Sequence, residues 1–165
     1  MRGNTRIIYA PGANPQLEDV GLHGTHMATK IGGPVYGVAK NANVVSVKMP
    51  YEIIAYDAVM SIPGFIAALV ETGRDIVRYG LQGIAVINIS LGCGSIALGN
   101  SGQMLILILV TEEDPALIAL LESTLEYLIA DLRAVVVCSA GNNFVVRKTF
   151  AQETNNIYSN NSIGC

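Results

Sequence analysis

The stretch His23-Gly24-Thr25-His26-Met27-Ala28 combines two histidines with a glycine, a threonine and two residues that favour a helix. A histidine at the start of a helix is suited to general-base catalysis, because the unperturbed pKa of histidine lies near neutral pH. Gly24 has no Cβ and lets backbone or substrate approach closely. Taken alone, the stretch favours a helix-start histidine without a chemical role, and a general base is the alternative.

Strand and helix patterns alternate on the C-terminal side of this stretch. Residues 23–31 read as a helix ended by glycines, and residues 43–49 read as a β-branched strand. Further strands and helices follow at 61–79 (helix), 84–89 (strand), 114–132 (helix) and 134–139 (strand). This order predicts an α/β fold with three layers and a parallel sheet that is buried on both faces.

The composition fits one such domain. The chain has 165 residues, of which 51% are hydrophobic and 14% are charged. Its net charge of −3 gives no electrostatic case for a nucleic acid or an anionic membrane as a partner. The apolar run at 104–110 is shorter than the roughly 20 residues of a membrane span, and its place in the fold is not predicted.

Four segments, taken in order, resemble motifs of the subtilisin-like serine proteases, the subtilase family (peptidase S8). Residues 23–28 are similar to the family's histidine box, and residues 37–48 to the turn and strand that follow it. Residues 86–92 are similar to the substrate-binding strand, and residues 135–142 to the strand that delivers the oxyanion-hole asparagine. The resemblance implies a subtilisin-like domain.

The resemblance also implies roles for single residues. His23 takes the position of the general base, Asn142 that of the oxyanion donor, and His26 a structural position. Ser90, Leu91 and Gly92 match the substrate-binding segment, whose backbone pairs with an extended peptide. The alternatives are an ordinary turn asparagine at Asn142 and a strand that simply ends in a glycine turn at Gly92. Cys93 stands where the family has another glycine.

Two parts of the family's machinery are missing. The family's aspartate sits in an Asp-Thr-Gly or Asp-Ser-Gly turn after an apolar strand, about 30 residues before the histidine, and its serine lies about 150 residues after it. Both counts fall outside this chain, and no Gly-Thr-Ser-Met-Ala motif is present. Asp19 as a stand-in for the acid is the weaker alternative to a loop residue. We expect no metal site, no calcium loop between residues 32 and 37, and no cofactor.

We therefore expect a subtilisin-like domain that is truncated at both ends: an irregular segment at 1–22, the partial domain at 23–143 and a loose polar tail at 144–165. Two hypotheses follow. The chain is a fragment of an active serine endopeptidase, inactive alone and prone to self-association, or it is a pseudoprotease that binds extended peptides along residues 88–92. A generic ligand-binding parallel-sheet domain is a weaker third hypothesis. No apolar region follows the basic N-terminus, so we expect no signal peptide in this chain. The cysteines, three in number, are expected to be free.

Overall fold

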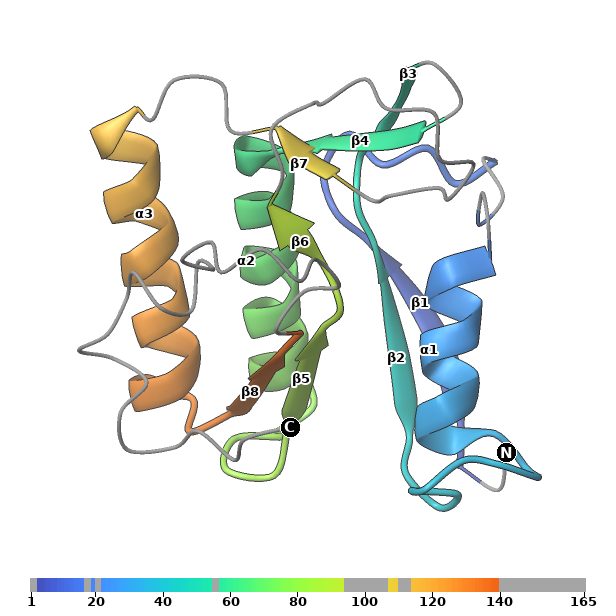
Figure 1. Cartoon of the computed structure of the whole chain (residues 1–165). Coiled ribbons are helices and arrows are strands. Elements are labelled where there is room, and N and C mark those ends of the chain that lie inside the picture. Colours follow the sequence, from blue (N-terminus) through green and yellow to red (C-terminus); the bar gives the residue numbers. More distant parts are fainter. Residues whose placement is uncertain are drawn as a thin grey trace.

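The computed structural model describes residues 3–16, 19, 22–54, 57–93, 107–109 and 114–139. This part of the chain contains both helices and strands (Figure 1). In chain order they are β1 (Thr5–Tyr9), α1 (His23–Gly32), β2 (Val44–Lys48), β3 (Glu52–Ile54), β4 (Asp57–Ser61), α2 (Ile62–Arg78), β5 (Val86–Ile89), β6 (Gly92–Cys93), β7 (Leu107–Leu109), α3 (Pro115–Glu126), the π-helical turn η2 (Tyr127–Asp131) and β8 (Val135–Cys138).

Two pairs of parallel strands are each joined through a helix. β1 pairs with β2 from Thr5 opposite Val44 to Tyr9 opposite Lys48, and α1 lies in the connection and packs on β2. β5 pairs with β8 from Val86 opposite Val135, and α3 lies in the connection between them. Parallel strands need such crossovers, so the α/β fold that the sequence predicts is present in the structure.

Helices α2 and α3 each begin at a residue whose side chain caps the first turn. The Ser61 hydroxyl accepts a hydrogen bond from the backbone N–H of Gly64 at 3.2 Å, at the start of α2. The Asp114 carboxylate accepts one from the N–H of Ala116 at 2.9 Å, and Pro115 occupies the first helical position of α3. The predicted helix starts at these two places are confirmed.

The hydrophobic core lies between α2, α3 and the β5–β8 pair. Leu128 is fully buried at its centre, and the cluster around it is made of Met60, Ile62, Phe65, Ile66, Leu69, Ile76, Leu121, Leu125, Leu132 and Ala134. A Cβ built on Gly73 of α2 would lie 3.2 Å from Leu128, so the absence of a side chain there lets the two helices approach. Helix α2 also contacts β1 and β2 on its other side (Figure 1).

A third sheet, which the sequence did not predict, has the strand order β3-β4-β7-β6. β3 and β4 form an antiparallel hairpin, and β7 runs parallel to both β4 and β6. Part of the apolar run at 104–110 is therefore the strand β7. Gly92 and Cys93 of β6 lie opposite Leu107 and Ile108.

Two expectations need correction. The described strands form three separate sheets rather than one, and β5 and β8 alternate between exposed and half-buried residues. Val86 keeps 67% of its surface exposed, because the helices α2 and α3 cover the other face of this pair. Within the segment 1–22, residues 6–10 read as a possible short strand, and β1 lies there and pairs with β2.

Candidate functional site

His23 is the first residue of α1, and this helix begins in an unusual way. Leu22, at the N-cap position, has a left-handed backbone with φ of 59° and makes no side-chain capping bond. Capping comes instead from Asp19, whose Oδ2 accepts hydrogen bonds from the backbone N–H of Thr25 at 2.7 Å and from its hydroxyl at 2.6 Å. A carboxylate at this end is favoured by the free N–H groups and by the helix dipole.

The His23 side chain reaches the end of β5. Its Nε2 lies 2.9 Å from the carbonyl oxygen of Ser90, a residue 67 positions away in the sequence. A carbonyl oxygen can only accept, so Nε2 carries the hydrogen and donates it. The structure thus brings the predicted base and the first residue of the predicted substrate segment into direct contact.

Ser90, Leu91 and Gly92 are held by contacts within the chain. The Asn88 amide donates to the Ser90 hydroxyl at 2.9 Å, and Gly92 is paired with β7. Ser139, directly after β8, donates from its backbone N–H to the carbonyl of Ile89 at 3.1 Å and from its hydroxyl to the carbonyl of Leu91 at 3.0 Å. The ends of β5 and β8 are therefore fastened together beside His23.

The sequence reasoning missed the part that Ser139 plays, although a signal was present. Ser90 and Ser139 each follow a strand of the same parallel pair. Carboxyl ends of neighbouring parallel strands meet at one edge, which predicts that the two serines lie close together. The part that Ser139 plays is structural, since its hydroxyl donates to the backbone carbonyl of Leu91.

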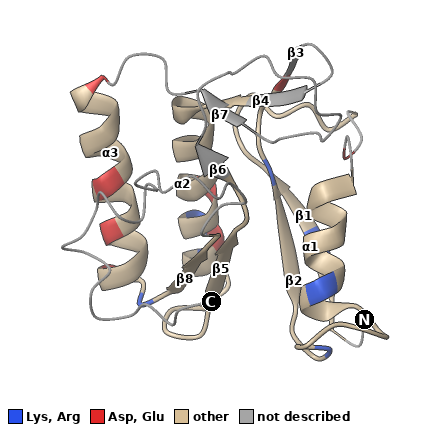
Figure 2. Cartoon of the chain, viewed as in Figure 1, with Lys and Arg blue, Asp and Glu red and all other residues tan. Residues whose placement is uncertain are grey.

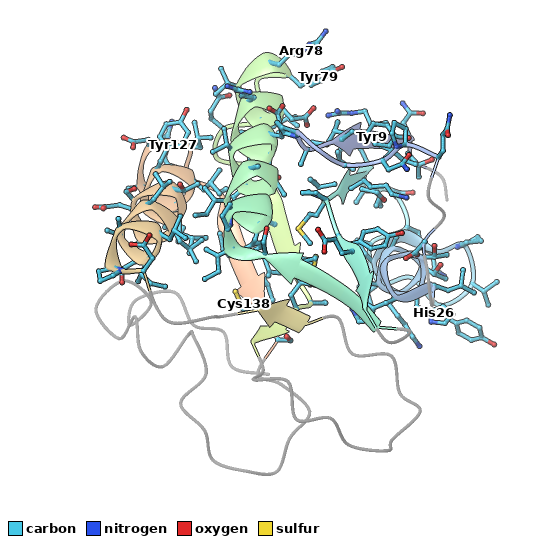
Figure 3. All side chains as sticks on the ribbon, turned by 90° about the horizontal axis from the view of Figure 1, so that it is seen from above. Tyr9, His26, Arg78, Tyr79, Tyr127 and Cys138 are labelled. Carbon is cyan, nitrogen blue, oxygen red and sulfur yellow. The ribbon has the colours of Figure 1, made fainter. Side chains whose placement is uncertain are left out.

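The remaining candidates have different outcomes. Asn142 lies outside the described residues, so its role as an oxyanion donor stays a prediction. His26 is exposed on α1 (Figure 3). Among the described side chains, no ion pair joins Asp19 to His23, and no group of three or more His, Cys, Asp or Glu residues is gathered as a metal site would require.

Two titratable groups near these elements have shifted pKa values. Burial raises the pKa of the Tyr51 phenol, and the negative charge of Asp19 raises it further. Burial also raises the pKa of the Cys138 thiol, at the end of β8. A thiol with a raised pKa is a poor nucleophile at neutral pH, so Cys138, which is free of any disulfide, is suited to packing rather than to catalysis.

Charges divide unevenly over the described elements. Carboxylates gather on α3, whereas α1 and the segment after it carry lysines (Figure 2). Residues 20–51 contain no aspartate or glutamate at all. Asp19 is therefore the carboxylate that directly precedes a long segment without negative charge. None of the described helices has the length and apolarity that crossing a membrane requires.

Comparisons with known proteins agree with the resemblance in the sequence. The profile of the subtilase family (peptidase S8) matches residues 4–164. Subtilisin-like protease 4 of Trichophyton equinum is 42% identical over 72 residues, and the protein of that name from Arthroderma gypseum is 40% identical over 72 residues.

These matches cover 44% of this chain but only 17% of the length of each relative. No solved structure is significantly similar to the chain. The family profile nevertheless spans nearly all of the sequence, including β1 before the histidine and the strands β5 and β8 behind the contact of His23 with Ser90. The chain therefore belongs to the subtilase family.

Proposed function

We propose that this chain is part of a serine endopeptidase domain, in which His23 is the general base, Asn142 the oxyanion donor and Ser90, Leu91 and Gly92 the peptide-binding segment. We further propose that the chain does not cleave peptide bonds by itself. The observation that carries the first proposal is the 2.9 Å contact between His23 Nε2 and the Ser90 carbonyl. A base must lie beside the bound peptide, and this contact brings the two predicted parts together.

The hydrogen on Nε2 supports the second proposal. In a serine protease triad, Nε2 must be free to accept the proton of the serine, while the acid holds the hydrogen on Nδ1. In this chain Nε2 donates to Ser90, which is the opposite tautomer. His23 in this arrangement cannot act as a base through Nε2 until its hydrogen moves.

The turn after β1 also supports the absence of a triad acid. The family's aspartate turn follows an apolar strand, and here the apolar strand β1 is followed by Ala10-Pro11-Gly12. The N–H of Ala13 donates to the carbonyl of Ala10 at 2.9 Å, and Gly12 has φ of 84°, which is the pattern of a type II turn. None of Ala10, Pro11 and Gly12 carries a carboxylate, so the turn after β1 supplies no acid that could orient His23.

A peptidase assay tests these proposals. Purified chain, His23→Ala and His26→Ala are incubated with a mixture of fluorogenic peptides and with a fluorophosphonate probe for reactive serines. His26 is a matched control because it lies on the same helix and is exposed. We expect no turnover and no labelling in any of the three. Turnover that disappears only in His23→Ala would show that the chain is active and that a serine assigned here to structure is the nucleophile.

Peptide binding without cleavage is the second candidate function. Among the described strands, β5 pairs only with β8, so its other edge has no partner strand that could exclude a peptide. A peptide that reached Ser90 would compete with His23 for its carbonyl oxygen. We therefore expect apolar extended peptides to perturb the amide resonances of Val86–Ile89 in an NMR titration, and to bind His23→Ala more tightly than the unchanged chain. Unperturbed β5 resonances would contradict this function.

A further inference from the structure

The start of α1 has no capping group of its own. Helix α1 contains no acidic residue in its first turn, and Leu22 offers no side-chain acceptor. The first turn of a helix frays readily when it has no capping acceptor, because its N–H groups have no partner within the helix. A frayed first turn would release His23, the first residue of the helix. Something outside the helix must therefore hold this turn.

Asp19 supplies that hold from outside the helix. One carboxylate oxygen accepts both the backbone N–H and the hydroxyl of Thr25, at 2.7 and 2.6 Å. The backbone carbonyl of Asp19 also accepts the N–H of Leu22 at 3.0 Å. The chain is thus fixed on both sides of His23.

The packing around the carboxylate agrees with this. A Cβ built on Gly24 would lie 3.5 and 3.7 Å from the two carboxylate oxygens, so the carboxylate lies directly against the residue that follows His23. On its other side the charge of Asp19 is close enough to act on Tyr51, which packs against the hydrophobic core. Asp19 therefore stands between the start of α1 and a side chain anchored in the core.

We infer that Asp19 is a positioning residue for His23: its bonds to Thr25 fix the first turn of α1 and thereby hold the imidazole against the Ser90 carbonyl. This differs from a triad acid, which would bond to the imidazole itself, whereas the carboxylate is engaged with Thr25. This clamp, the pair of hydrogen bonds from Thr25 to Asp19, is present in the chain without any bound peptide. Only its role in peptide binding rests on the proposed function.

The imidazole hydrogen of His23 gives a direct measurement of the clamp. A hydrogen on Nε2 that is bonded to a carbonyl exchanges slowly enough with water to be seen by NMR, whereas that of the exposed His26 exchanges too fast. We expect this resonance in the unchanged chain and its loss in Asp19→Ala, together with about fivefold faster amide exchange at Thr25, because a cap contributes roughly 1 kcal/mol. No peptide is present, so the result does not depend on the proposed function.

Four further variants separate the loss of the Asp19–Thr25 bonds from a general loss of structure. Asp19→Asn keeps an oxygen acceptor and Thr25→Ser keeps both donors, so both should retain the resonance, whereas Thr25→Val loses the hydroxyl bond and should weaken it. Asp114→Ala removes an N-terminal cap of the same kind from α3 and should leave His23 unchanged. If Asp19→Ala does not fold, Thr25→Val carries the test. A His23 resonance that is undiminished in Asp19→Ala, or in Thr25→Val when the former does not fold, would overturn the inference.

Discussion

The helical body (α2, β5, α3, η2 and β8) and the histidine lobe (β1, α1 and β2) are held together in different ways. The body buries large apolar side chains, with Leu128 fully buried and Leu69, Ile76 and Leu125 nearly so. Within α1 the lobe buries only Gly32, and the strands of the lobe are at most half-buried. The lobe is positioned instead by specific polar contacts, namely Asp19 with Thr25, His23 with Ser90 and Arg6 with Asp75.

This difference matters for function because His23 lies on the region with less apolar packing. Apolar burial is not directional, whereas hydrogen bonds fix both distance and orientation. The body supplies the stability of the chain, and the polar contacts decide where the imidazole points. Changes in the body should therefore alter unfolding, and changes in the lobe should alter geometry more than stability.

Leu128→Ala should have the largest effect on stability. Leu128 is fully buried against Gly73 of α2, and removing its side chain leaves a cavity between the helices. We expect a loss of about 2–5 kcal/mol in the free energy of unfolding, measured by urea denaturation. Val38 lies between α1 and β2 of the lobe and is 91% exposed. Val38→Ala should therefore change the free energy of unfolding by less than about 0.5 kcal/mol. Equal losses in the two variants would remove the distinction between the regions.

Arg6→Ala should have the second largest effect, because Arg6 links the lobe to the body. Its guanidinium forms a two-pronged ion pair with Asp75 of α2, with Nη2 2.6 Å from Oδ2, and lies 4.1 Å from the centre of the Tyr79 ring. Figure 3 shows Tyr79 beside Arg78 at the end of α2. Asp75 is only 11% exposed, so losing Arg6 leaves a poorly solvated carboxylate, and we expect a cost of about 1–3 kcal/mol.

A matched pair of variants checks the explanation for Arg6. Arg74 pairs with Glu71 on the surface of α2, and its side chain is largely exposed, so Arg74→Ala should cost less than about 1 kcal/mol. The double variant Arg6→Ala with Asp75→Ala should recover part of the loss, because it removes the unpaired carboxylate as well. If the double variant is no more stable than Arg6→Ala, desolvation of Asp75 is not the cause.

Asp114→Ala should have a smaller effect, and it sharpens the contrast between the two capped helices. Asp114 caps α3 from the adjacent position, with one hydrogen bond to the N–H of Ala116. Losing it should cost about 1 kcal/mol, measured by thermal or urea unfolding. Because α3 is also held by the core, we expect the whole chain to unfold in one step with a shifted midpoint. Local fraying of α3 without a shifted midpoint would contradict the view that the body unfolds as a unit.

The sequence predicted the elements with strong local signals better than the contacts between distant residues. The helices at 61–79 and 114–132 were predicted from the spacing of their apolar residues, and the second also from Asp114 and Pro115 at its start. The contact of His23 with Ser90 was not predicted, because no local pattern links residues 67 positions apart. The hairpin β3–β4 and the strand β7 were missed, since short apolar runs fit a loop as well as a strand.

Burial was predicted less well than secondary structure. Continuous apolar runs at 84–89 and 134–139 indicated strands covered on both faces, yet Val86, Val135 and Val137 are exposed. A run of valines indicates that a strand favours burial on both faces. Whether both faces are buried depends on the positions of other elements, which the sequence of the strand does not determine. The cap from Asp19 was missed for a related reason: it lies six residues before its partner Thr25, outside the usual capping spacing.

The smallest expected effect is a pH dependence from Cys138, in the body. Burial raises the pKa of this thiol, so between about pH 8.5, where an ordinary thiol titrates, and its raised value the folded chain keeps the proton that the unfolded chain loses. The unfolded state then binds fewer protons, and stability falls as the pH rises through this window, by less than about 1.4 kcal/mol per pH unit. Below the window both states are protonated and no dependence arises from this group.

Urea midpoints at pH 7.5 and pH 9.5 measure this fall in stability, and Cys138→Ala should lessen it. The raised pKa of Tyr51 acts in the same direction, but from about pH 10 upward. A fall of the same size in Cys138→Ala would therefore assign the dependence to other groups and would mean that the end of β8 is less well covered than the rest of the body.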